Sequence, residues 1–211
     1  MDSCTERCSS GQRGDDQPSR EKYSSRNPIS RYLVRNFFSK LGEILDVTEG
    51  KLLDVGAGAG DAYMFLPAEV KRRGVVAVEP NAAYFERMSE IAPELEQVEG
   101  SIYELPFDDK SFDTVMCSEV LEHLTEPDKG MRELVRVCRR WLVVSVPREP
   151  LWRVLNIVRG AYLSSFGNTP DHLQHWTKRG FVGWVSEYAV VKKVRCPLPW
   201  TIVLAETRQE Q

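Results

Sequence analysis

Residues 51–65 read KLLDVGAGAGDAYMF, and three glycines at positions 56, 58 and 60 follow a short apolar run. An apolar run, a glycine-rich turn and then helix-forming residues predict a strand, a tight turn and a helix. Glycines in such a turn let the backbone approach a ligand closely. The stretch therefore predicts a ligand-binding turn after the first strand of an α/β fold.

Strand-like and helix-like segments alternate on both sides of this turn. The sequence predicts strands at 51–55, 74–79, 95–99, 112–117, 141–146, 189–196 and 200–208. It predicts helices at 28–46, 61–73 (bent or broken at Pro67), 81–92, 127–140 and 177–188. This order favours right-handed crossovers and a mainly parallel sheet. The expected fold is a Rossmann-like, doubly wound, mostly parallel seven-stranded sheet that ends in an antiparallel hairpin.

Composition limits the class of protein. The 211 residues are 42% hydrophobic and 28% charged, with a formal net charge of −3. These values are typical of a soluble globular protein and argue against a nucleic-acid partner. With no apolar run of about 18 residues and no signal-peptide core, we expect no membrane span and a cytoplasmic protein. The five cysteines are then expected as thiols, and Cys4 and Cys8 lack companions for a zinc site.

The spacing of the glycines separates classes of nucleotide site. No Lys-Ser or Lys-Thr pair follows them, which excludes a phosphate-binding P-loop. The dinucleotide fingerprint would need its third glycine at position 61, where the chain has Asp61, and the third glycine is Gly60 instead. An aspartate at this helix start competes with a pyrophosphate for the helix dipole. An NAD-dependent oxidoreductase remains an alternative.

Carboxylates at the ends of two predicted strands indicate another ligand. Asp54 precedes the glycines, and Glu79 ends the second strand. A carboxylate at the end of the second strand can accept hydrogen bonds from both ribose hydroxyls of a nucleoside. A cofactor with a sulfonium and an ammonium group, but no phosphate, would favour these acidic surroundings.

Four segments in register now carry a family resemblance. LLDVGAGAG, VVAVEP, EGSIYELPFDDKSFDTV and CSEVLEHLTEP together resemble the class I S-adenosylmethionine-dependent methyltransferases, of the small-molecule, methyltransferase domain 11 type. The resemblance covers about residues 50–147 and implies a methyltransferase that uses S-adenosylmethionine. A noncatalytic partner protein that binds this cofactor is a further alternative.

The resemblance also implies a set of cofactor-binding residues. These are Asp54, Gly56, Ala57, Gly58, Gly60, Glu79, Pro80, Ser101, Ile102, Ser118 and Glu119. Asp54 would anchor the amino group, Glu79 would hold the ribose, and the glycines would let the backbone approach the methionine and ribose. Ser101, where the family often has an acidic residue, and Ile102 would flank the adenine. Ser118 and Glu119 would line the pocket after the fourth strand.

The same segment narrows the class of acceptor. Methyltransferases of DNA adenine and of glutamine often carry Asn/Asp-Pro-Pro-aromatic after the fourth strand, where this chain reads Cys117-Ser118-Glu119-Val120. This difference and the acidic charge favour a small-molecule acceptor. Residues 1–22 are expected to be a disordered tail, and 23–211 a single domain, with an N-terminal helix or lid at 23–48. The family commonly forms its acceptor site from a variable segment, here 148–180.

Three histidines are the candidate catalytic residues. His123 follows the fourth strand, where it could shape the pocket or transfer a proton. His172 and His175 lie in the variable segment, and three interpretations stay open for them: acceptor binding or general base catalysis, packing of a loop around Trp176, and metal ligation. No third ligand is evident, so no metal is expected. The chain is expected to be a monomer or a homodimer. The apolar stripe at 151–162 is expected to pack as a lid helix over the acceptor pocket, and a dimer face or a peripheral membrane contact is the alternative.

Overall fold

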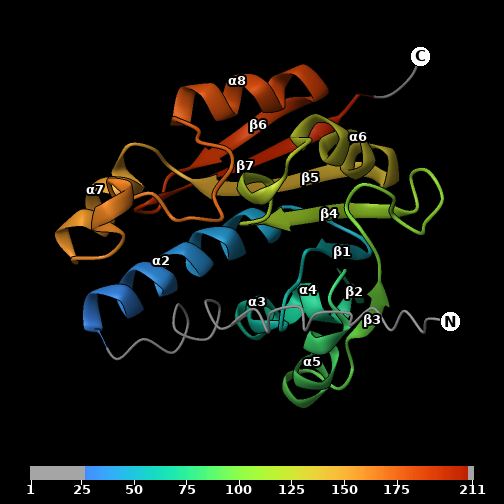
Figure 1. The fold of residues 1–211 in the computed structure, drawn as a ribbon. Coiled ribbons are helices and arrows are strands. Elements are labelled where there is room, and N and C mark those ends of the chain that lie inside the picture. The colour runs from blue at the N-terminus through green and yellow to red at the C-terminus, as the bar shows by residue number, and fades with distance from the viewer. Residues whose placement is uncertain (1–26, 209–211) are drawn as a thin grey trace, which may run out of the picture.

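A seven-stranded sheet runs through the part of the chain that this computed structural model describes, residues 27–208 (Figure 1). Its strands are β1 (Leu52–Val55), β2 (Val75–Glu79), β3 (Glu96–Glu99), β4 (Phe112–Ser118), β5 (Cys138–Pro147), β6 (Ala189–Arg195) and β7 (Trp200–Thr207). The spatial order is β3-β2-β1-β4-β5-β7-β6. Strands β1 to β5 pair in parallel, while β7 is antiparallel to both β5 and β6. The fold predicted from the sequence is confirmed.

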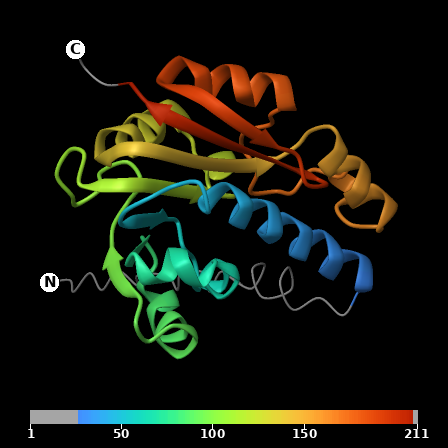
Figure 2. The ribbon, with the colours of Figure 1, turned by 180° about the vertical axis from the view of Figure 1, so that it is seen from behind.

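Helices cover both faces of this sheet (Figures 1 and 2). They are α2 (Pro28–Leu45), α3 (Asp61–Phe65), α4 (Ala68–Arg72), α5 (Phe85–Ile91), α6 (Pro127–Val137), α7 (Leu151–Val158) and α8 (Lys178–Tyr188), with 3-10 turns η1 (Ala82–Tyr84), η2 (Leu121–His123) and η3 (Leu163–Ser165). One core cluster joins α6 and α8 to one face, and a second joins α2, α4 and α5 to the other. Residues that alternate along a strand therefore enter different clusters, such as Leu52 and Leu53.

Local sequence explains where several elements begin and end. Asn27 caps α2 by accepting a hydrogen bond from the amide of Ile29 at 2.9 Å, as its position before Pro28 predicts. Proline breaks the helix after the glycine turn, so that α3 and α4 flank Pro67. The helix predicted at 127–140 ends earlier, at Val137, because Cys138 already pairs with Phe112 as the start of β5.

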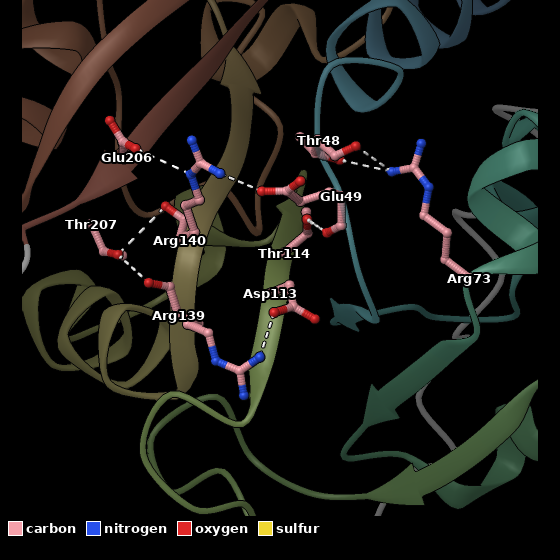
Figure 3. A network of polar contacts seen from close by, with 9 residues as sticks. All are labelled: Thr48, Glu49, Arg73, Asp113, Thr114, Arg139, Arg140, Glu206 and Thr207. Carbon is pink, nitrogen blue, oxygen red and sulfur yellow. Dashed lines mark hydrogen bonds and ion pairs between the residues drawn. The ribbon is translucent and has the colours of Figure 1, made fainter.

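Ion pairs link neighbouring strands along the side of the sheet that is formed by strand ends, where β4 and β5 begin and β7 ends (Figure 3). Asp113 accepts from Arg139 at 2.5 Å, and Arg140 pairs with Glu206 at 3.2 Å and also with Glu49. We call this the amino edge. The opposite edge, where the parallel strands end, is the carboxyl edge, and in open α/β sheets it is the edge at which ligands bind.

No helix among residues 27–208 combines the length and the apolarity needed to cross a membrane. The expected disordered tail at 1–22 lies outside the described residues, as do Cys4 and Cys8.

Candidate functional site

The glycine turn lies at the carboxyl edge, and its three glycines have different structural roles. All three have positive φ angles: 77° at Gly56, 55° at Gly58 and 78° at Gly60. A Cβ added to Gly56 would lie 2.3 Å from Cγ2 of Val120, and one added to Gly60 would lie 2.7 Å from Cγ of Met88. A Cβ on Gly58 would meet no atom within 4 Å. Gly56 and Gly60 are therefore required by packing, whereas Gly58 presents its backbone to open space.

Glu79 is held against this turn. Its Oε2 accepts a hydrogen bond from the amide of Gly58 at 2.9 Å, and its Oε1 accepts one from the amide of Asn81 at 3.1 Å. The residue is buried. Each carboxylate oxygen has two lone pairs, so both oxygens can accept a further hydrogen bond. The two amides thus fix the orientation of a carboxylate that is able to bind hydroxyl groups.

Asp54 lies on β1, the strand beside β2, and is buried like Glu79. Burial, and then the negative charge of Glu79, raise the pKa of Asp54 from 3.8 to about 7. The negative charge of Glu79 on the neighbouring strand disfavours the ionised form of Asp54, and a positive charge beside the two residues relieves this repulsion. This acidic pair therefore suits a cationic ligand.

The predicted adenine-side residues lie after β3. Ser101 is exposed, and its Oγ accepts a hydrogen bond from the amide of Tyr103 at 3.2 Å. Ile102 is buried in the same core cluster as Leu124. Of the other predicted cofactor residues, Ala57 is buried and Pro80 is exposed. The predicted adenine side therefore has a buried apolar side chain at Ile102, and the hydroxyl of Ser101 is engaged within its own turn.

Ser118 and Glu119 form a polar group with residues that the sequence did not indicate. The hydroxyls of Ser118 and Ser145 lie 2.9 Å apart. Glu119 has a φ of 60°, and its Oε2 accepts a hydrogen bond from Nε1 of Trp200 at 2.5 Å. Trp200 also packs against Phe37 of α2, with ring centroids 4.9 Å apart. The terminal strand and the N-terminal helix thus meet beside the end of β4.

His123, His172 and Glu122 lie together just beyond the end of β4. One potential ligand atom from each of the three side chains lies within 4.8 Å of the others. Nδ1 of His123 is 3.0 Å from the carbonyl oxygen of Asp171, and its Nε2 is 3.8 Å from Oε1 of Glu122. The two imidazole rings meet edge to face, with centroids 5.0 Å apart. Glu122 and His172 are buried, and His123 is half-buried.

Backbone hydrogen bonds attach the loop that carries His172 to the 3-10 turn η2, which follows β4. The amides of Leu173 and Gln174 donate to the carbonyl oxygen of Glu122 at 2.8 and 2.9 Å. The ring of Trp152 stacks on His172, with centroids 5.6 Å apart and 28° between the planes. The variable segment therefore holds His172 in place from two sides.

His175 has different neighbours from His172. Its Nδ1 lies 3.9 Å from Oε1 of Glu149. Burial, together with the charge of Arg153, lowers the pKa of His175, and Glu149 opposes this effect. The two histidines, three residues apart in the sequence, therefore contact different groups. The residues that join His172 are His123, which the sequence proposed, and Glu122, which is adjacent to it in the same EVLEH segment.

Val120 lies between the glycine turn and the group of Glu122, His123 and His172. Val120 packs against Gly56 of the glycine turn, and Glu122 lies two residues further along the chain. The open backbone at Gly58 and the acidic pair on β1 and β2 fit S-adenosylmethionine, a nucleoside with sulfonium and ammonium groups. The same features do not favour a pyrophosphate, because Asp54, Glu79 and Asp61 are all acidic.

Comparison with known proteins gives a family match. Residues 53–141 match the family model described as "Methyltransferase domain". An uncharacterised methyltransferase of Schizosaccharomyces pombe is 34% identical over 100 residues, which are 42% of this chain and 36% of that protein. The ubiquinone/menaquinone biosynthesis C-methyltransferase UbiE of Xylella fastidiosa is 32% identical over 116 residues, 52% of this chain and 43% of that protein. The chain spans less than half the length of the curated relatives it matches.

A solved structure has the same fold. Magnesium protoporphyrin IX methyltransferase from Synechocystis PCC 6803, with bound SAH, superposes with a TM-score of 0.66 at 14% identity. The superposition covers 90% of this chain and 93% of that one. At this level of identity the likeness shows the fold.

Proposed function

We propose that this chain, whose residues 53–141 match the family model described as "Methyltransferase domain", is a class I S-adenosylmethionine-dependent methyltransferase that acts on a small-molecule acceptor. The observation that carries the proposal is the open backbone of Gly58 beside the buried pair Asp54 and Glu79. S-adenosylmethionine, when bound, supplies an electrophilic methyl group on its sulfonium sulfur.

The residues of the carboxyl edge divide the work of binding. In this proposal Glu79, already oriented by the Gly58 and Asn81 amides, accepts hydrogen bonds from the ribose hydroxyls. Asp54 neutralises the ammonium group, which favours its ionised form. Ile102 provides an apolar surface for the adenine, and the exposed Ser101 lies beside it.

The acceptor binds, in this proposal, on the side of His172 and His123. Val120 packs against the glycine turn and precedes the η2 turn that carries His123, and in this proposal an acceptor atom near the histidines approaches the methyl group in line. Holding two reactants in such an orientation supplies a large part of catalysis. The net charge of −3 and the sequence Cys117-Ser118-Glu119-Val120 support a small molecule rather than nucleic acid as the acceptor.

Two further expectations belong to the proposal. Cys117, Cys138 and Cys196 are free thiols, which supports a reducing compartment such as the cytoplasm. In this proposal the chain is a monomer or a homodimer, and size-exclusion chromatography with light scattering separates the two.

The test is calorimetry with S-adenosylhomocysteine and NAD on the same protein. We expect saturable one-to-one binding of S-adenosylhomocysteine and no heat with NAD. The reverse result would overturn the proposal in favour of an oxidoreductase. Tight binding of S-adenosylhomocysteine with no methyl transfer across a broad panel of acceptors would instead identify a noncatalytic cofactor-binding protein.

A second measurement tests the acceptor side. We expect His172→Ala to keep the affinity for S-adenosylhomocysteine within about twofold and to lower turnover by about 100-fold. His175→Ala is the matched control, and we expect a much smaller loss because His175 lies against Glu149. Full activity of His172→Ala would contradict the assignment of the acceptor side.

A further inference from the structure

Glu122, His123 and His172 gather three potential metal ligands beside the proposed acceptor side. The ligand atoms, one from each residue, all lie within 4.8 Å of one another. Metal bonds of about 2.0–2.2 Å place neighbouring ligand atoms roughly 3–4 Å apart. Small rotations of these side chains therefore bring all three atoms onto one ion. We propose that this cluster is a binding site for a divalent transition-metal ion.

The hydrogen bond made by His123 selects the nitrogen that faces the cluster. A carbonyl oxygen only accepts hydrogen bonds, so the 3.0 Å contact with Asp171 places the proton on Nδ1 of His123. The lone pair is then on Nε2, the nitrogen that lies 3.8 Å from Oε1 of Glu122. A metal-bound histidine commonly donates its other nitrogen to a carbonyl or carboxylate in this manner.

The supporting structure fixes the cluster from both sides. Glu122 and His123 share the 3-10 turn η2, and the amides of Leu173 and Gln174 tie the His172 loop to the backbone of Glu122. Gln174 adds a third bond, from its Nε2 to the carbonyl oxygen of Leu124 at 3.0 Å. Trp152 stacks on His172. Ligands held in this way lose little conformational entropy on binding an ion.

The composition of the cluster selects the class of ion. Two imidazoles and one carboxylate bind Zn²⁺, Fe²⁺ and similar ions, while Mg²⁺ and Ca²⁺ prefer oxygen ligands. Glu122 is 2% exposed, and a cation beside it offsets the cost of burying its charge. Three protein ligands also leave coordination positions open for water or a substrate atom.

Nearby acidic and histidine side chains stay outside the cluster. Glu119 lies three residues before Glu122, but its carboxylate accepts from Trp200 at 2.5 Å and Ser145 at 3.3 Å. His175 lies against Glu149. The metal site does not depend on the proposed function. If both are correct, the open coordination positions lie on the proposed acceptor side.

The test uses the full chain, stripped of metal with a chelator and then titrated with Zn²⁺ by calorimetry. We expect one Zn²⁺ per chain, and visible absorption bands when Co²⁺ replaces it. Glu122→Gln and His172→Ala should each lower the Zn²⁺ affinity by about 100-fold or more. Even the loss of a residue that only hydrogen-bonds to a metal ligand typically lowers metal affinity by about 10- to 100-fold. His175→Ala, the matched control in the same loop, should bind Zn²⁺ as the unchanged protein does.

Cofactor binding separates the two proposals and reports folding. Variants that lose Zn²⁺ but bind S-adenosylhomocysteine normally are folded, and they support the site. Absence of Zn²⁺ binding by a chain that binds S-adenosylhomocysteine would overturn the metal site and leave the proposed function intact. An equal loss of Zn²⁺ in His175→Ala, or none in Glu122→Gln and His172→Ala, would also overturn it.

Discussion

The carboxylates at the amino edge and at the carboxyl edge of the sheet differ in their partners and in their burial. At the amino edge Asp113 and Glu206 pair with Arg139 and Arg140 (Figure 3); the two arginines are exposed, and the two carboxylates are half-buried. At the carboxyl edge the buried Glu79 accepts hydrogen bonds from backbone amides, and beside it the pKa of Asp54 is raised to about 7.

This difference distinguishes charged residues that pair with each other from charged residues that are able to bind a ligand. Exposed ion pairs contribute little to stability, and either partner can be lost without a large effect. Buried carboxylates near one another destabilise the ligand-free protein, and a cation relieves this cost. An edge that concentrates buried acid is thus the edge expected to bind cationic ligands.

The largest expected effect comes from removing the oriented carboxylate. Glu79→Ala should weaken S-adenosylhomocysteine binding by about 100-fold, because two charge-assisted hydrogen bonds to the ribose contribute roughly 3 kcal/mol. Calorimetry measures this change directly. Glu206→Ala, its counterpart at the amino edge, should leave the affinity unchanged. Equal losses in the two variants would remove the distinction between the edges.

Two substitutions in the glycine turn should have different effects, one mainly on stability and the other mainly on cofactor binding. Gly56→Ala should lower the free energy of unfolding by about 2–3 kcal/mol, because its Cβ would lie 2.3 Å from Val120. Gly58→Ala should cost only about 1 kcal/mol, for its positive φ, while cofactor affinity falls by about tenfold. Urea unfolding and calorimetry measure the two quantities. A larger loss of stability at Gly58 than at Gly56 would contradict these roles.

The affinity for S-adenosylhomocysteine should rise with pH. With a pKa of about 7, Asp54 goes from roughly 10% ionised at pH 6 to roughly 90% at pH 8, so an ammonium group should bind about tenfold more tightly at pH 8. Binding should release protons, which calorimetry in two buffers of different ionisation enthalpy detects. Asp54→Asn should abolish the trend, and Asp113→Asn at the amino edge should keep it.

The contribution of Asp54 to the stability of the ligand-free protein should fall as the pH rises. Folding raises the pKa of Asp54 from 3.8 to about 7, so its protonated form stabilises the fold at low pH. That contribution is lost as the pH rises through about 7. Asp54→Asn should therefore unfold at higher urea concentration than the unchanged protein at pH 8. A stability gain from pH 5 to 8 that vanished in Asp54→Asn would contradict the raised pKa.

The smallest effect is expected at the amino edge itself. Arg140→Ala removes contacts with Glu49 and Glu206, yet all these side chains are partly or largely exposed. The melting temperature should fall by no more than about 2 °C, and less at high salt. Cofactor binding should not change. A loss of cofactor affinity would show that the two edges are coupled.

Some elements and residues could be predicted because their signals are local. The glycine turn, the strand-ending Glu79 and the break at Pro67 each follow from a few neighbouring residues. The end of α6 could not be placed in this way. Residues 138–140 continue the helical pattern, but pairing between Cys138 and Phe112 of β4 makes them part of β5.

Local patterns in the sequence were enough to predict the α/β order, the glycine turn and the acidic ends of β1 and β2, since backbone preference and hydrophobic period act over a few residues. The grouping of His172 with Glu122 and His123, rather than with its neighbour His175, follows from the folding of the whole chain. Folding also brings Trp200 to Glu119, 81 residues away in the chain. Contacts of this kind depend on how strands and loops assemble at the carboxyl edge, which no local pattern encodes.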